Sequence, residues 1–87
     1  MEIHYVYIIY SKARSLYYKG YSTRPYARLE EHNGGLSRYT KEKGPWELVF
    51  LQSFSTKKEA LQREKSLKRA NPKYLRWVIL QSYNLVA

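Results

Sequence analysis

The stretch Tyr5–Tyr10, with the sequence Tyr-Val-Tyr-Ile-Ile-Tyr, decides the fold of this chain. Every side chain in it is β-branched or aromatic, so neither face of the segment is polar. A strand that leaves one face in water alternates between apolar and polar residues, whereas a strand covered on both faces does not. The pattern therefore predicts a central strand with other elements packed above and below it.

Strand and helix signals follow in a definite order along the rest of the chain. A polar turn at 11–15 leads into a second apolar stretch, Leu16–Tyr21, and so short a connection is typical of a β-hairpin. A third strand is expected at Trp46–Phe54, after the basic, irregular segment Leu36–Gly44. The expected helices cover 24–33, Thr56–Ala70 and Pro72–Ser82. The order β-β-α-β-α-α predicts an α+β fold, and 87 residues leave room for one domain, 1–87.

Capping and breaking residues set the expected helix ends. The segment Ser22–Pro25 offers a hydroxyl cap followed by a proline in the first turn, and Asn33–Gly35 ends that helix. Thr56 and Glu59 have the spacing of a capping box, and Asn71-Pro72 begins the last helix.

Charge and composition indicate the kind of partner. Sixteen Lys and Arg against seven acidic residues give a net charge of +9, and ten tyrosines accompany them. A strong positive field with many aromatic side chains favours a polyanion, most often nucleic acid. All seven acidic residues are glutamates, only two histidines occur and cysteine is absent, which excludes disulfides, thiolate sites and multi-histidine zinc sites. An enzyme of this composition is expected to work with one carboxylate and one metal ion.

Two side chains, Glu64 and His32, occupy positions that helical periodicity assigns to the core, and Arg28 flanks one of those faces. Glu64 lies among the apolar residues of the helix 56–70, where an unpartnered carboxylate is costly. His32 lies on the face of the first helix that we expect to be buried, which is centred on Leu29 with Pro25 and Tyr26 beside it. Arg28 precedes His32 by four residues, so both side chains leave the helix on one side.

Each of these residues also has a structural interpretation. Glu64 has an ion-pair partner within reach in Arg63 or Lys68. Arg28 can be interpreted as an ordinary surface arginine. His32 in a last helical turn favours the helix dipole. The basic side chains of the C-terminal half form a solvated face in this interpretation. Gly20 within the second strand indicates a bulge or the close approach of another group.

Taken in order, these stretches resemble the GIY-YIG nucleases. The first signature of that family is present as Tyr5-Val6-Tyr7 and the second as Tyr18-Lys19-Gly20. Arg28 and His32 follow at the family's spacing, and Ala60–Glu64 resembles the helix that carries its catalytic glutamate. Two positions depart from the pattern: the leading glycine of the first signature is missing, as in small stand-alone members, and Lys19 replaces an aliphatic residue.

The resemblance implies a three-stranded antiparallel sheet flanked by helices, and phosphodiester hydrolysis with one divalent metal. Glu64 would hold Mg²⁺ or Mn²⁺, and Arg28 would neutralise the phosphate. Tyr18 would orient or deprotonate the attacking water, with Tyr7 in support. For His32 two roles stay open, proton transfer and the fixing of Tyr7 by a hydrogen bond.

The expected partner is DNA, branched or damaged, with a role in DNA repair or processing. Specificity would come from DNA shape, from the basic helices or from a partner protein, and RNA stays open as a substrate. The residues expected to bind nucleic acid are Lys19, Arg38, Lys41, Lys65, Lys68 and Arg69.

Two other functions compete with this prediction. A non-catalytic nucleic-acid-binding module of the same fold would bind DNA with a steep salt dependence and never cut it. A protein-interaction adaptor would use its exposed tyrosines instead. The stretch Tyr5–Tyr10 is too short for a membrane span or signal core, so the expectation is a cytoplasmic monomer without a membrane partner. Membrane-surface binding by a basic amphipathic helix remains the alternative for the C-terminal half.

Overall fold

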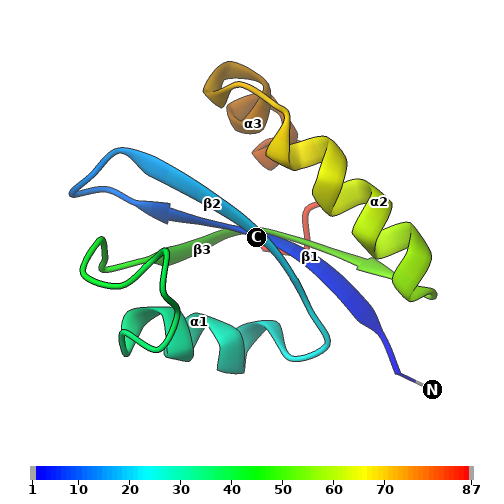
Figure 1. Ribbon diagram of the computed structural model, residues 1–87. Coiled ribbons are helices and arrows are strands. Elements are labelled where there is room, and N and C mark those ends of the chain that lie inside the picture. Colours follow the sequence, from blue (N-terminus) through cyan, green and yellow to red (C-terminus); the bar gives the residue numbers. More distant parts are fainter. Residues whose placement is uncertain (1, 87) are drawn as a thin grey trace.

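Strand β1 (His4–Ser11) lies at the centre of a three-stranded antiparallel sheet with the order β2-β1-β3. The computed structural model describes residues 2–86. The other elements, shown in Figure 1, are β2 (Leu16–Ser22), α1 (Pro25–Asn33), β3 (Glu47–Phe54), α2 (Lys57–Lys68) and α3 (Pro72–Ile79). The predicted β-β-α-β-α-α order and the α+β class are confirmed.

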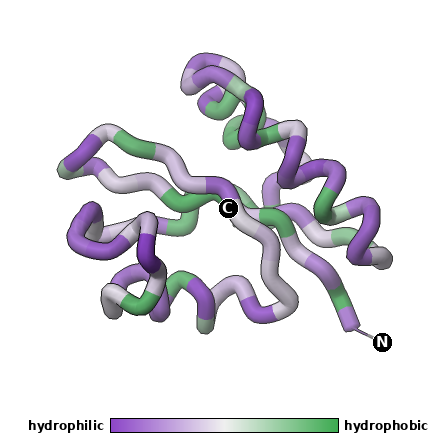
Figure 2. The backbone as a smooth tube through the Cα atoms, viewed as in Figure 1, coloured by the Kyte–Doolittle hydropathy of each residue, from purple (hydrophilic) through white to green (hydrophobic). Residues whose placement is uncertain are grey.

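Both faces of β1 are covered, as its composition predicts. Helices α2 and α3 lie over one face and α1 lies over the other (Figure 1). Val6 and Ile8 join the hydrophobic cluster under α2 and α3, whereas Tyr7 and Ile9 join a second cluster on the α1 side. In Figure 2, hydrophilic residues run along most of α2. The alternation of side chains along β1 therefore divides the core into two halves.

Gly20 of β2 lies directly opposite Tyr7 of β1 in the antiparallel register. A Cβ atom at Gly20 would lie 2.3 Å from the Tyr7 hydroxyl oxygen, well inside van der Waals contact. The close approach that a glycine in this strand indicates is therefore made by the Tyr7 ring.

The helix ends follow the sequence signals with two exceptions. Thr56 Oγ1 accepts a hydrogen bond from the Glu59 backbone N–H, and Asn71 caps α3 in the same way. The predicted hydroxyl cap of α1 is wrong: Arg24 occupies the N-cap position and makes no side-chain capping bond within the described residues. The Ser22 hydroxyl accepts the Arg24 N–H instead, because β2 extends through Ser22. The last helix ends at Ile79, short of the predicted Ser82.

The outer edge of β3 is covered by the C-terminal segment. Asn84 Oδ1 accepts the backbone N–H of Leu51, and the Leu85 N–H bonds to the Leu51 carbonyl oxygen. The Asn84 amide donates to the carbonyl oxygens of Val49 and Ile79, so this side chain joins β3 to the end of α3. No helix within residues 2–86 combines the length and the apolar character that crossing a bilayer requires.

Candidate active site

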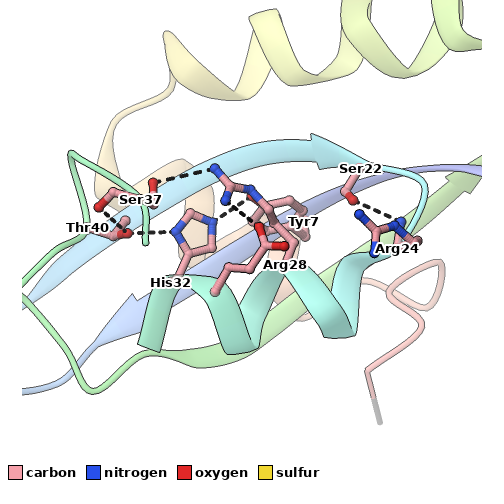
Figure 3. A network of polar contacts seen from close by, with 8 residues as sticks. Tyr7, Ser22, Arg24, Arg28, His32, Ser37 and Thr40 are labelled. Atoms are coloured by element: carbon pink, nitrogen blue, oxygen red, sulfur yellow. Dashed lines mark hydrogen bonds and ion pairs between the residues drawn. The ribbon is translucent and has the colours of Figure 1, made fainter. Parts of the chain in front are cut away.

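A chain of buried hydrogen bonds links the sheet to α1 and to the loop that follows it. The Tyr7 hydroxyl lies 2.8 Å from His32 Nε2, and His32 Nδ1 lies 2.7 Å from Thr40 Oγ1 (Figure 3). The loop is held in turn by Trp46, whose indole N–H donates to the Thr40 carbonyl oxygen at 3.1 Å. All four side chains are almost completely buried.

The hydrogen bonds around His32 favour one tautomer of its ring. The Thr40 hydroxyl donates to the Ser37 carbonyl oxygen at 3.5 Å, which leaves its own oxygen to accept from His32 Nδ1–H. Nε2 of the neutral ring is then unprotonated and accepts the Tyr7 O–H. In this tautomer the Tyr7 proton is directed at His32, and the Tyr7 oxygen faces the Arg28 guanidinium as a hydrogen-bond acceptor.

The protonation states agree with this assignment. Burial, and after it the nearby positive charge of Arg28, together lower the pKa of His32 to about 4, so the imidazole is neutral at pH 7. Burial also raises the pKa of Tyr7 well above its usual value, and a negative charge on Tyr18 would add to that effect. Tyr7 is therefore a neutral phenol, held in one orientation by a neutral imidazole.

Helix α1 places Arg28 one turn before His32, beside Tyr7 (Figure 3). Its guanidinium pairs with Glu31 at 2.8 Å and approaches the Ser37 hydroxyl at 3.5 Å. The side chain is 33% exposed, so the cation is held in position yet open to solvent. The expected buried face of α1 is confirmed for Pro25 and His32 but is wrong for Tyr26, which is 61% exposed.

Tyr18 lies on the same face of the sheet, in contact with His32. The two ring centroids are 5.0 Å apart in an edge-on arrangement, and Tyr39 stacks on Tyr18 at 5.5 Å. Tyr17 packs into the opposite hydrophobic cluster, as strand alternation predicts. The structure thus brings Tyr7, Tyr18, Arg28 and His32 together from two strands and one helix.

Glu64 comes from α2, on the other face of the sheet. It lies at the edge of the core rather than within it, since Ala60 and Leu67 are buried but Leu61 is exposed. Its side chain is mostly buried, at 17% exposed, and the carboxylate lies 3.4 Å from Nζ of Lys68. The charge of Glu64 nevertheless contributes to the raised pKa of Tyr7, which places the two groups in one electrostatic neighbourhood.

Two lysines lie on the surface beside Tyr18. Lys19 and Lys68 line a pocket of about 160 Å³ together with Tyr17, Tyr18 and Tyr39. Burial lowers the pKa of Lys19, and the positive charge of Lys68 lowers it further. Two cations that repel each other beside phenol groups form a surface that favours an anion.

The remaining predicted nucleic-acid contacts are more scattered. Arg38 and Lys41 are exposed in the loop between α1 and β3, and Lys41 lines a pocket of about 440 Å³ whose wall includes His32. Lys65 and Arg69 are exposed near the end of α2.

The donor atoms limit how a metal ion would be held. Within residues 2–86 no three His, Cys, Asp or Glu side chains are grouped as a metal site. A hydrated Mg²⁺ or Mn²⁺ fits, because such ions prefer oxygen and keep several water ligands. The Glu64 carboxylate would supply one such oxygen, and its present partner is the Lys68 ammonium at 3.4 Å.

Sequence reasoning missed the side chains that orient the predicted ones. Thr40 and Ser37 lie in an irregular loop, where no periodic pattern marks a buried residue. The role of Asn33 was also missed. Its side-chain oxygen accepts the Trp46 backbone N–H at 2.6 Å, and this hydrogen bond fixes the point at which the loop returns to β3. Trp46 followed by a strand was the one available signal, since a tryptophan at a loop end commonly closes the loop onto the core.

Comparison with known proteins agrees with this arrangement. Residues 3–76 match the family described as the GIY-YIG catalytic domain. A UPF0213 protein of Staphylococcus haemolyticus is 46% identical over 69 residues, which cover 78% of this chain and 83% of that protein. The UPF0213 protein YazA of Bacillus subtilis is 41% identical over 71 residues, 80% of this chain and 71% of its relative.

A solved structure shows the same fold. The solution NMR structure of a UPF0213 protein of Bacillus halodurans superposes with a TM-score of 0.59 at 30% identity, covering 93% of this chain and 86% of that one. The family match spans both signature tyrosines, Arg28, His32 and Glu64. The chain therefore belongs to the GIY-YIG family, a family of nuclease domains.

Proposed function

We propose that this chain is a metal-dependent endonuclease that hydrolyses phosphodiester bonds in DNA, with a preference for DNA shape and a role in repair or processing. The observation that carries the proposal is the oriented Tyr7–His32–Thr40 chain beside the half-exposed Arg28 guanidinium. Binding of DNA alone would be served by exposed cations, whereas an oriented phenol beside a guanidinium is what attack on a phosphate requires.

In this proposal Tyr7 positions the attacking water. Its O–H is committed to His32, so its oxygen accepts a hydrogen bond from the water and aligns it with the phosphorus. The low pKa of His32 favours the fixing role over proton storage, because an imidazole with a pKa of about 4 holds a proton poorly at pH 7. Tyr18, in contact with His32, faces the same space and is the second phenol for the water.

Arg28 neutralises the phosphate under attack. Its planar guanidinium donates two parallel hydrogen bonds to phosphate oxygens, and its charge does not titrate. The pairing with Glu31 holds it in place before the substrate binds, so little side-chain order has to be created during the reaction.

The ion at Glu64 would stabilise the negative charge that develops on the phosphate and on the leaving 3′ oxygen. Glu64, from α2, would hold this ion, and Arg28, from α1, would act on the phosphate. One water molecule is consumed: its oxygen bonds to phosphorus, the bond from phosphorus to the 3′ oxygen breaks, and the 3′ oxygen acquires a proton. Lys19 and Lys68 contact phosphates outside the scissile one.

The decisive experiment compares Glu64→Gln with wild type on labelled linear and branched DNAs, with Mg²⁺ or Mn²⁺. We expect metal-dependent cleavage by wild type, none by Glu64→Gln, and similar DNA binding by both. Glu30→Gln, which removes an exposed carboxylate from α1, is the matched control and should cut normally. Binding without cleavage by wild type on every substrate would make the chain a non-catalytic module.

Thermal melts test whether the loss of cleavage in Glu64→Gln has a structural cause. Lys68 is 53% exposed, so Glu64→Gln leaves no buried cation behind. The Lys68 side of this pair is open to solvent although the Glu64 side chain is only 17% exposed, so the pair contributes on the order of 0.5–1 kcal/mol. Equal melting temperatures for Glu64→Gln and Glu30→Gln would assign the lost cleavage to chemistry, whereas a much lower one for Glu64→Gln would assign it to the fold.

A further inference from the structure

Helix α3 carries an exposed pair of stacked aromatic rings away from the catalytic residues. The centroids of Tyr74 and Trp77 are 5.6 Å apart with an interplanar angle of 25°. Tyr74 is 43% exposed and Trp77 is 53% exposed, while Leu75 and Val78 of the same helix are buried in the core. The core therefore fixes the helix, and the two rings point outward from a rigid support.

The rings form one wall of a concave surface. A pocket of about 410 Å³ is lined by Asn71, Lys73, Tyr74 and Trp77. Asn71 is committed to capping α3, since its side chain accepts the Tyr74 N–H at 2.8 Å. What remains for a ligand is two aromatic rings, an ammonium group and an open space beside them.

The charged residues of the segment that carries this surface are all of one sign. After Glu64 the sequence contains no acidic residue, but it contains Lys65, Lys68, Arg69, Lys73 and Arg76. Arg69, Lys73 and Arg76 are exposed on α3 or just before it. An acidic or neutral protein surface would satisfy the rings or the charges, but a chain of phosphates carrying flat bases satisfies both at once.

We propose that the surface formed by Lys73, Tyr74 and Trp77 binds unpaired nucleotides of a single DNA strand, with a base stacked on the exposed rings and its phosphates on the lysine and the neighbouring arginines. Paired bases keep their faces inside the helix, so duplex DNA offers nothing to stack. The surface thus favours single-stranded over duplex DNA. This inference concerns binding and does not depend on cleavage.

The two tryptophans of the chain provide the measurement. Trp77 is exposed, whereas Trp46 is 4% exposed and hydrogen-bonded to the Thr40 carbonyl oxygen. A short oligodeoxythymidylate is titrated into the protein in buffer with a chelator, where no metal-dependent cutting occurs. We expect the tryptophan emission to be quenched on binding, and the quenching to vanish in Trp77→Phe, which retains Trp46.

Affinity is measured in parallel by the fluorescence anisotropy of the labelled oligonucleotide. Stacking on an aromatic side chain is large enough that Trp77→Ala should weaken binding by roughly tenfold or more. Trp77→Phe keeps a ring and should lose much less. Tyr26→Ala removes an equally exposed aromatic side chain from α1 and should leave the affinity unchanged. Lys73→Gln should lower the log–log salt slope by about 0.7, as one lost phosphate contact on a single strand predicts.

Three results would overturn the inference. The first is wild-type affinity in Trp77→Ala, and the second is competition by duplex DNA as strong as that of the single strand. The third is a wild-type dimer in sedimentation that Trp77→Ala converts to monomer, because the rings would then join two copies of this chain. Loss of cleavage without any of these results would leave the single-strand site intact and refute the proposed function alone.

Discussion

Tyr7 and Gly20 are cross-strand partners, and the ring of Tyr7 fills the space above the glycine where a side chain would otherwise lie. The central strand therefore sends a phenol across its neighbour to the outer edge of the sheet. The position of the hydroxyl depends on two residues that make no hydrogen bond with each other: the glycine leaves room for the ring, and His32 receives its proton.

The first prediction tests this packing. In Gly20→Ala the new Cβ would lie 2.4 Å from the ring carbon that bears the Tyr7 hydroxyl, so the ring must move and the bond to His32 must break. We expect loss of cleavage and a destabilisation of about 1–3 kcal/mol, measured by activity and thermal melts. The same substitution in a Tyr7→Leu background should cost much less, because the ring that it meets is gone. An equal cost in both backgrounds would contradict the packing argument.

The second prediction concerns stability at acidic pH. His32 has a folded pKa of about 4, against an unfolded value near 6.5, so the unfolded chain binds a proton that the folded chain refuses. The stability is fully present above pH 6.5 and falls as the pH drops toward 4, by about 3 kcal/mol for this one group.

Denaturant unfolding of wild type and His32→Gln between pH 4 and 7.5 measures this contribution. Other carboxylates and the neighbouring Arg28 are common to both proteins, so the difference between the two curves isolates His32. We expect the difference to shrink as the pH falls. A difference that stays constant with pH would mean that the pKa of His32 is the same in the folded and unfolded chains.

The third prediction separates Arg28 from ordinary surface cations. Arg28→Lys keeps the charge but loses the planar fork, so cleavage should fall roughly 10- to 1,000-fold. DNA binding should weaken far less, because the other cations remain. Arg24→Lys, at an exposed position one turn earlier, is the control and should cut normally. Equal losses of binding and cleavage in Arg28→Lys would make it a binding anchor only.

The fourth prediction concerns a residue with no part in the chemistry. Asn84 makes four hydrogen bonds, to the backbones of Val49, Leu51, Ile79 and Val86. Asn84→Ala leaves these groups without a partner and should destabilise the protein by about 1–3 kcal/mol. Below the lowered melting temperature its cleavage rate should equal that of wild type. Gln62→Ala, at an exposed position of α2, should change neither quantity.

Local patterns predicted the fold because most of its elements have local causes. Strand β1 is apolar on both faces, and Thr56 and Asn71 cap their helices with their own side chains. The wrong predictions concern residues whose position depends on a neighbouring element or on the rotation of the helix. Ser22 belongs to the end of β2 and bonds to Arg24, so it is not a helix cap. Tyr26 follows Pro25 by one residue, a rotation of about 100°, which turns it from the buried face to solvent.

The sequence predicted the candidate catalytic side chains but not the side chains that orient them. The spacing of four residues from Arg28 to His32 is a property of one helix and is visible in the sequence. The partner of His32 Nδ1 is not, because Thr40 reaches it through an irregular loop whose path depends on Asn33 and Trp46. A contact made through loop geometry leaves no periodic trace. The tautomer of His32, and with it the direction of the Tyr7 proton, required the structure.

Thr40 is bonded from both ends, its hydroxyl to His32 and its carbonyl oxygen to Trp46. Because all three side chains are also buried, each contributes to stability as well as to the orientation of Tyr7. A loss of only 1–2 kcal/mol can change the cellular abundance of a protein several-fold. A genetic selection for loss of function would therefore recover substitutions at these positions both through inactive protein and through degraded protein. If only the frequency of recovered substitutions were counted, the loop that carries Thr40 would be mistaken for a second catalytic centre.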